Sequence, residues 1–378
     1  MKLAFIDMIP WDYDAGTPYE RAMGGSQSGV CYLAVELANR GHQVTLCNGS
    51  KESRAFRGVQ TAPIVNLPRT VFEDCAAAIV LNGPAQLSQI LRAQIPSGCR
   101  LILWTGHLPD LPPLQGLSHA EIREGWDAVV CVSHWHRQVM LGQYPLDPNR
   151  VRVFCNAVAP PFAGDLPDSA EFAQQKSPAP VFAYTSTPFR GLDILLDVFE
   201  RLHQQIPGAR LEVYSSMGIY FAQENEDPYR ALYERCRAMS GAKYIGALPQ
   251  PHLAEALKPA WILSYPSTFV ETSCIAVMEA MASGMQVVTA NLGALAETTS
   301  GMGTLVPPLT DLGDRARFVE AFAKAIKSVI DEASRDPRQF WSVKLRQARA
   351  VRSQCNWAAR AAEWEQMLLG LVKSESTR

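Results

Sequence analysis

The feature that most constrains the fold of this 378-residue chain is a regular alternation of short apolar runs with amphipathic helical patterns. Such runs are typical of strands buried on both faces, and their alternation with helices indicates βαβ units. We expect strands at residues 3–7, 43–47, 77–81, 101–105, 128–132 and 151–155. A helix is expected over residues 28–42, where apolar residues recur at three and four and Gly41 suits the helix end. The pattern predicts an α/β fold with doubly wound sheets.

A proline-rich segment separates two similar halves of the chain. Residues 159–180 contain five prolines and few large apolar side chains, which favours a linker. The alternation of apolar runs and helical patterns then resumes, with strands expected at residues 181–185, 210–216, 242–246, 260–266 and 286–291. We therefore predict two Rossmann-like domains, residues 1–158 and 181–356, facing each other across a cleft. Ligands of such sheets bind at the carboxyl ends of the strands.

Composition narrows the class of protein. A formal net charge of −2 gives no reason to expect a nucleic-acid partner, which would require clustered Lys and Arg. The nine cysteines are scattered and form no CxxC pair. We therefore expect free thiols in a reducing compartment rather than disulfides or a zinc site.

The N-terminal sequence MKLAFIDMIPWDYDAG lacks the long apolar core and small-residue cleavage site of a signal peptide. Elsewhere no run approaches the roughly 20 apolar residues that span a bilayer. We expect a cytoplasmic protein without a transmembrane segment, and leave open a peripheral contact with a membrane. The oligomeric state is also left open.

Two glutamates stand out in residues 264–308. Glu271 and Glu279 are separated by seven residues, the first in a loop and the second in a helix expected over about 273–284. This spacing allows both carboxylates to face one cleft. Taken alone, it also allows a simpler interpretation, in which Glu279 is a solvated helix residue and Glu271 is an N-terminal charge favoured by the helix dipole.

The same segment resembles the E-x7-E signature of retaining family 4 glycosyltransferases of the GT-B fold, also described as glycosyl transferases group 1. Matching positions are Glu271 and Glu279, the run EAMASG at 279–284, Val287–Val288, Gly293-x3-Glu297 and the run GTLVPP at 303–308. The resemblance is strong over residues 180–310, moderate over 1–160 and weak beyond 310. It implies that the last helix, 357–372, returns to the N-terminal domain.

The resemblance assigns a role to each glutamate. In that family the first Glu lies against the donor sugar and the second binds the ribose hydroxyls, so these roles fall to Glu271 and Glu279. A carboxylate can accept hydrogen bonds from two vicinal hydroxyls. Backbone N–H groups at the helix start, Ser273, Cys274 and Ile275, would bind the diphosphate, as helix N-termini bind anions. Gly293 belongs to the same implied nucleotide-sugar site.

This chain departs from the family in two places. The usual Pro-Phe-Gly-Leu after the first Glu is replaced by residues 272–275, Thr-Ser-Cys-Ile, which lack the glycine. Arg190-Gly191 stands where Lys-Gly is common, but the Arg about six residues earlier is replaced by Tyr184, followed by Thr185, Ser186 and Thr187. One cation is thus exchanged for hydroxyl donors, and we predict that Thr185 and Ser186 bind the nucleotide sugar. The implied role of Arg190 is to stabilise the departing diphosphate. The alternative is a surface Arg that flanks a helix.

Two further segments resemble family positions in the first half. Gly24-Gly25-Ser26-Gln27 is similar to a Gly-Gly-Ser-Glu segment near the β-phosphate and the acceptor, so Gly25 and Ser26 are predicted to bind there. The spacing of Gly24, Gly25 and Gly29 does not fit a nicotinamide-binding GxGxxG. His107 matches a histidine that faces the donor sugar. For His134 and His136 we expect cleft-rim or surface positions rather than a metal site.

The implied reaction is transfer of a hexosyl or related group from a nucleotide diphosphate sugar to an acceptor hydroxyl, with retention of configuration. A UDP-sugar is favoured and a GDP-sugar is allowed; the acceptor is a sugar, a lipid-linked molecule or a protein. No prosthetic group or metal is expected. Two alternatives stay open: a phosphorylase-like or donor-hydrolysing enzyme, and a catalytically silent nucleotide-sugar-binding or scaffold protein.

Overall fold

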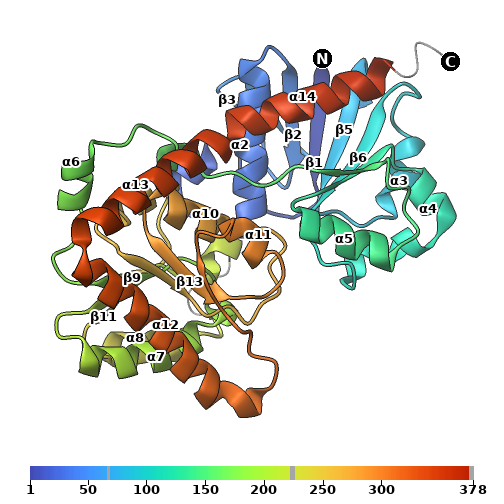
Figure 1. Ribbon diagram of the computed structural model, residues 1–378. Coiled ribbons are helices and arrows are strands. Elements are labelled where there is room, and N and C mark those ends of the chain that lie inside the picture. The colour runs from blue at the N-terminus through green and yellow to red at the C-terminus, as the bar shows by residue number, and fades with distance from the viewer. Residues whose placement is uncertain (66–68, 222–225, 374–378) are drawn as a thin grey trace. The chain divides into compact units, whose positions relative to one another are not determined.

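A computed structural model describes residues 1–65, 69–221 and 226–373 of the chain. The chain forms two compact units, Met1–Pro18, Gly25–Ala157 and Trp357–Arg378 in the first, and Tyr19–Gly24 and Val158–Asn356 in the second. Both are mixed α/β structures built around a parallel sheet, as the alternating pattern predicts (Figure 1).

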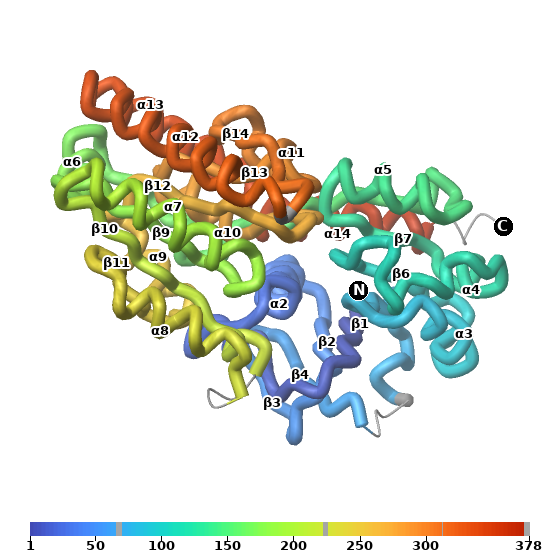
Figure 2. Tube along the Cα trace, turned by 90° about the horizontal axis from the view of Figure 1, so that it is seen from below, coloured from blue at the N-terminus to red at the C-terminus, as the bar shows by residue number. Residues whose placement is uncertain are grey.

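The first unit contains an eight-stranded sheet in the order β3-β4-β2-β1-β5-β6-β7-β8. Figure 2 follows it from β3 and β4 through β2 to β1. Its strands are β1 (Lys2–Asp7), β2 (Gln43–Asn48), β3 (Arg54–Phe56), β4 (Val59–Pro63), β5 (Cys75–Leu81), β6 (Arg100–Thr105), β7 (Ala128–Cys131) and β8 (Val151–Val153). All six strands expected from apolar runs in this half are confirmed. Strands such as β5, CAAAIVL, are almost wholly buried, which explains their continuous apolar runs.

The sheet edge formed by β3 and β4 was not predicted, because these short strands have no continuous apolar run. They are antiparallel, unlike the other pairs, and are joined through Arg57 and Gly58. Both residues have positive φ, 44° and 82°, as a two-residue hairpin turn requires.

Helices cover this sheet, and the last one comes from the far end of the chain. They are α2 (Gly25–Asn39), α3 (Leu87–Arg92), α4 (Ala120–Glu124), α5 (His134–Gln143) and α14 (Trp357–Lys373), with the short α1 (Thr17–Glu20) before α2. Helix α14 packs against α2 (Figure 1). Its buried Trp364 lies 5.2 Å from the Trp104 ring and 5.1 Å from the Phe154 ring. The buried side chains of α14 are therefore part of the core of this unit.

The second unit contains a six-stranded sheet in the order β11-β10-β9-β12-β13-β14, with every pair parallel. The strands are β9 (Val181–Tyr184), β10 (Arg210–Val213), β11 (Ala242–Tyr244), β12 (Ile262–Tyr265), β13 (Gln286–Ala290) and β14 (Thr304–Val306). The five expected strands are confirmed with shorter ends, and β14 was not anticipated. The order reverses between β9 and β12, so their carboxyl ends form the topological switch point where such sheets bind ligands.

Helices lie on both faces of the second sheet, with α10 and α13 above it and α7 and α12 below it in Figure 1. The helices are α6 (Ser169–Gln174), α7 (Leu192–Gln205), α8 (Arg230–Ala238), α9 (Gln250–Ala256), α10 (Ile275–Ala282), α11 (Leu295–Thr299), α12 (Arg315–Arg335) and α13 (Pro337–Gln354). Glu297 lies in α11.

The segment 159–180, predicted to be a linker, has structure of its own within the second unit. It holds α6, whose Phe172 is buried, and the buried Lys176. The Lys176 ammonium donates to the backbone oxygens of Ala260 and Ser283 at 3.1 and 2.9 Å. The prolines therefore mark a change of direction, whereas Phe172 and Lys176 attach the segment to the core.

Among the described helices, none combines the length and the apolar character that crossing a bilayer requires.

Candidate functional site

The switch point of the second unit brings together two predicted residues, Arg190 and Glu271. Arg190 Nη1 donates a hydrogen bond of 2.5 Å to Glu271 Oε1, which joins the loop after β9 to the loop after β12. The Glu271 side chain is only 5% exposed and that of Arg190 is 21% exposed. Burial lowers the pKa of Arg190, but Glu271 and other acidic groups nearby together more than offset this, so the net pKa is raised and the guanidinium stays charged. Arg190 is thus not a surface residue flanking a helix.

A tyrosine that the sequence analysis treated only as part of a strand completes this cluster. The Tyr265 hydroxyl donates to Glu271 Oε1 at 2.5 Å, and Tyr265 is fully buried at the end of β12. The Arg190 guanidinium also lies over the Phe269 ring, 4.3 Å from its centroid. The signal for Tyr265 is a polar hydroxyl at the carboxyl end of a buried strand.

Two glycines allow neighbouring backbone segments of this site to approach each other closely. Gly191 has a φ of 105°, and a Cβ there would lie 2.2 Å from the Pro266 backbone oxygen. Gly293 has a φ of 61°, and a Cβ would lie 2.3 Å from the Glu271 backbone oxygen. Residues 271 and 293 form an isolated parallel bridge, and Ala294 N donates to Glu271 O at 2.7 Å. Gly293 therefore supports the backbone that carries Glu271.

The hydroxyls after β9 differ in how they are used. Thr185 Oγ1 and Thr187 Oγ1 are buried and meet no hydrogen-bond partner within the described part of the chain. Ser186 Oγ lies 3.4 Å from the Tyr265 hydroxyl oxygen. The Tyr184 hydroxyl, at the position of the missing family Arg, donates to Thr187 O at 2.7 Å and so shapes this loop. A buried hydroxyl without a protein partner can still bind a polar ligand.

The start of α10 lies next to this cluster. Cys274 is the N-cap residue and Ile275 the first helical residue, and the first N–H groups of a helix have no partner within it. Ser273 precedes them. The Cys274 φ of −89° is open to any residue, so the backbone here does not require the family glycine. Burial raises the pKa of the Cys274 thiol, which favours its neutral form.

Glu279 contacts a different set of groups from Glu271. It is 3% exposed on the buried side of α10, so it is not a solvated helix residue. Its Oε1 accepts a hydrogen bond of 3.3 Å from Ala159 N. Burial raises the pKa of Glu279 to about 8, although hydrogen bonds from Ala159 and Gln250 act in the opposite direction. The carboxyl is therefore largely protonated at neutral pH when no ligand is bound.

Polar residues also gather at the carboxyl end of the first sheet. Ser26, at the start of α2 next to Gly25, accepts a hydrogen bond of 2.9 Å from Asn82 Nδ2. Asn82 follows β5, and its Oδ1 accepts from Gly106 N at 2.8 Å. Gln27 donates to Asp7 Oδ2, at the end of β1, at 3.1 Å. Asp7 and Asn82 were missed, although each is a polar residue at the end of an apolar run.

His107 lies in the same region, just after β6. Its backbone oxygen is 2.8 Å from His136 Nε2, and its own Nδ1 is buried without a hydrogen-bond partner among the described residues. Burial lowers the pKa of His107, and it lowers that of His136 to about 4, so both rings are neutral at pH 7. His136 is buried rather than on the surface, which corrects that expectation. In the described ranges, no group of three His, Cys, Asp or Glu side chains could hold a metal ion.

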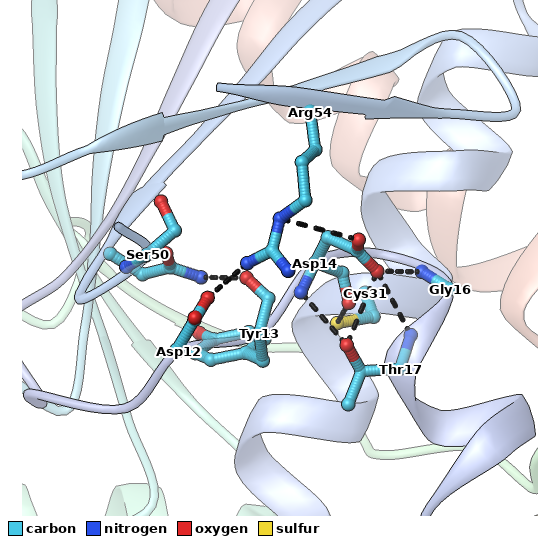
Figure 3. A network of polar contacts seen from close by, with 9 residues as sticks. Asp12, Tyr13, Asp14, Gly16, Thr17, Cys31, Ser50 and Arg54 are labelled. Atoms are coloured by element: carbon cyan, nitrogen blue, oxygen red, sulfur yellow. Dashed lines mark hydrogen bonds and ion pairs between the residues drawn. The ribbon is translucent and has the colours of Figure 1, made fainter. Parts of the chain in front are cut away.

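The loop after β1 is held by an arginine from the unpredicted hairpin. Figure 3 shows the Arg54 guanidinium between the Asp12 and Asp14 carboxylates, with Arg54 Nε 3.6 Å from Asp14 Oδ2. Asp14 Oδ1 in turn accepts from the backbone N–H groups of Gly16 and Thr17 at 2.8 and 3.1 Å. Because both acidic groups are already used, we interpret this network as support for the loop.

Comparison with solved structures gives the architecture. Sucrose-phosphate synthase from Thermosynechococcus elongatus has a TM-score of 0.68 and 18% identity, over 98% of this chain and 100% of that one. HepE from Anabaena, solved in complex with UDP-glucose, has a TM-score of 0.66 and 16% identity, over 98% of this chain and 100% of that one. The chain has the GT-B fold.

Sequence comparison concentrates on the second unit of this GT-B protein. Residues 180–332 match the family model described as Glycosyl transferases group 1. D-inositol 3-phosphate glycosyltransferase from Corynebacterium aurimucosum is 27% identical over 190 residues, which are 50% of this chain and 42% of that protein. The matched region thus spans less than half the length of this relative. The Arg190–Glu271 pair and the whole of α10 lie within residues 180–332.

Proposed function

We propose that this GT-B protein is a retaining family 4 glycosyltransferase, which moves a hexosyl or related group from a nucleotide diphosphate sugar to an acceptor hydroxyl. The observation that carries the proposal is the Arg190–Glu271 pair at the switch point, beside the start of α10. A cation, a carboxylate and helix-end N–H groups are the set that a sugar diphosphate needs.

The chemistry follows from where charge develops. Breaking the anomeric C–O bond places positive charge on the sugar and negative charge on the diphosphate. In our proposal Arg190, the Thr185 hydroxyl and the N–H groups of residues 273–275 stabilise the diphosphate, and Glu271 lies against the donor sugar. The acceptor oxygen bonds to the anomeric carbon on the face from which the diphosphate departs, which gives retention, and the leaving phosphate takes the acceptor proton.

Glu279 is proposed to bind the ribose. Its pKa of about 8 means that ionisation is accessible slightly above neutral pH, and the ionised group accepts from both vicinal hydroxyls. Gly25 and Ser26 are proposed to bind near the β-phosphate and the acceptor, and His107 is proposed to face the donor sugar. Their place at the carboxyl end of the first sheet supports these roles.

The donor is proposed to be a UDP-sugar, with a GDP-sugar as the second choice. UDP-glucose bound to HepE supports the first. We place the reaction in cytoplasmic glycan, polysaccharide or glycoconjugate biosynthesis, and the acceptor is a sugar, a lipid-linked molecule or a protein.

A binding and product test examines this proposal. Calorimetry with UDP, GDP and ADP should detect binding of at least one, weakened in Glu279→Ala. The matching sugar nucleotide should be consumed, more slowly in Arg190→Ala, and nuclear magnetic resonance of the product should show the donor's anomeric configuration. No binding to any nucleotide would contradict the proposal. Binding without consumption, with or without acceptors, would instead indicate a silent nucleotide-sugar-binding protein.

A further inference from the structure

The Tyr265 hydroxyl and the Arg190 guanidinium both bind the same oxygen of Glu271, Oε1, and each donor lies 2.5 Å from it. We infer that Tyr265 is a positioning residue that orients the Glu271 carboxylate so that its other oxygen, Oε2, is presented to the donor sugar. The inference rests on the proposed function, in which Glu271 lies against that sugar.

Convergence of two donors on one oxygen fixes the carboxylate. Both hydrogen bonds that the described residues give to this carboxylate end on Oε1. Rotation about the terminal bond of a Glu side chain meets only a low barrier, so one donor alone would leave the orientation loose. Tyr265 belongs to a buried strand at the centre of the sheet, which makes it a rigid second support. Oε2 is then the acceptor left for a sugar hydroxyl.

Ser186 extends the arrangement to the neighbouring strand. Its Oγ lies 3.4 Å from the Tyr265 hydroxyl oxygen. Because the Tyr265 hydroxyl donates its hydrogen bond to Glu271, Ser186 is the donor in this contact. A hydrogen bond donated to a phenol oxygen strengthens the hydrogen bond that the phenol itself donates. Ser186 therefore acts through Tyr265, rather than by the direct contact with the nucleotide sugar that the sequence predicts.

The packing of Tyr265 makes it possible to test the inference by removing a single oxygen atom. Its ring is fully buried and lies 5.9 Å from the Tyr184 ring, so Tyr265→Phe keeps the ring and removes only the hydroxyl. The second unit offers a matched control: the Tyr214 hydroxyl donates to Glu212 Oε2 at 2.6 Å, and Tyr214 is 5% exposed. Tyr214→Phe removes a tyrosine–carboxylate hydrogen bond that is partly buried and that involves none of the residues proposed to bind the donor.

The experiment compares a nucleotide with its sugar conjugate. Calorimetry measures the affinities of UDP and UDP-glucose for wild type, Tyr265→Phe, Ser186→Ala, their double variant and Tyr214→Phe. Tyr265→Phe should bind UDP within about 2-fold of wild type but lose about 5- to 10-fold in UDP-glucose affinity, as expected for one hydrogen bond to a charged group. Ser186→Ala should show a smaller loss of the same kind, absent when Tyr265 is already Phe. Tyr214→Phe should leave both affinities unchanged.

The outcomes separate this inference from the proposed function. Equal losses for UDP and UDP-glucose, or an unchanged UDP-glucose affinity, in Tyr265→Phe would overturn the positioning role while the wild-type binding still supports the transferase. If wild type binds neither, the pairs GDP with GDP-mannose and ADP with ADP-glucose replace them. A wild type that binds none of the three pairs overturns the proposed function, and the inference with it.

Discussion

Arg190 and Glu271 are 81 positions apart in the chain, yet the Arg190 guanidinium lies 2.5 Å from the Glu271 carboxylate. They meet because β9 and β12 are neighbours in the sheet, and each residue follows one of these strands. Because Glu271 is almost fully buried, we expect this ion pair to affect both the stability of the protein and the charge of the site.

The first prediction separates these two roles of the pair. Arg190→Gln should lower donor turnover by about 100-fold, since it removes the cation that stabilises the leaving diphosphate. It should also destabilise the protein by about 3 kcal/mol, because it leaves a buried carboxylate without its counter-ion. Adding Glu271→Gln should restore much of the stability and none of the turnover. Urea unfolding and a donor-consumption assay measure the two effects.

A surface pair provides the control for this cycle. Arg237 is 44% exposed and pairs with Glu234 one helical turn away. Arg237→Gln should change stability by less than about 1 kcal/mol and leave turnover unchanged. If Arg190→Gln behaved in the same way, the pair would have neither the structural nor the electrostatic role given to it.

The second prediction concerns Gly293. In Gly293→Ala the new Cβ would meet the Glu271 backbone at 2.3 Å, so the loop carrying Glu271 must shift and the affinity for a sugar nucleotide should fall by at least about 10-fold. Gly301 has a similar φ of 74° and nothing within 4 Å of a built Cβ. Gly301→Ala thus carries the same backbone strain without the clash. Calorimetry should find its affinity unchanged; equal losses in both variants would show that strain alone is responsible.

Much of the fold could be predicted because buried parallel strands appear in the sequence as continuous apolar runs. β5 is such a run and was found, whereas β3 and β4 were not, since an edge hairpin alternates polar and apolar residues. The segment 159–180 was taken as a linker because its prolines are conspicuous. The attachment of Lys176 to two backbone oxygens depends on contacts that no local pattern contains.

The candidate site was predictable residue by residue but not as an arrangement. Arg190 and Glu271 were singled out from motifs, but their ion pair depends on strand order, which brings β9 beside β12. Tyr265 was treated as an ordinary strand residue, because nothing in the sequence shows which strand end its hydroxyl would meet. The burial of Glu279 could not be read from its spacing, because it depends on how Ala159 passes α10.

The third prediction follows from the raised pKa of Glu279. The folded-state pKa of about 8 exceeds the ordinary value of 4.5, so the stability that this group gives is present below pH 4.5 and is lost as the pH rises towards 8. Glu279→Gln should therefore be more stable than wild type, by more at pH 8 than at pH 5. It keeps the acceptor for Ala159 N but cannot ionise, so UDP affinity should fall by about 10-fold.

Glu255→Gln is the control for this variant, because Glu255 is 69% exposed in α9. Thermal unfolding between pH 5 and pH 8, with and without UDP, should show almost no difference between it and wild type. A Glu279→Gln protein whose stability relative to wild type did not depend on pH would contradict the buried-carboxyl assignment.

The fourth prediction concerns Lys176, which lies within residues 159–180, the segment predicted to be a linker. Burial, with a smaller effect of Arg352, lowers the pKa of Lys176 to about 7 from 10.5. Between these two pH values the unfolded chain binds one more proton than the native protein, so raising the pH stabilises the native state, by at most about 1.4 kcal/mol per pH unit. Lys176→Met removes this dependence, and the stability of wild type relative to the variant should rise from pH 7 to pH 9.5. Urea unfolding at several pH values measures this difference in stability, and Lys243→Met, at an exposed lysine, is the control. A difference between wild type and Lys176→Met that stays constant across this pH range would mean that Lys176 remains charged, stabilised by the Ala260 and Ser283 oxygens.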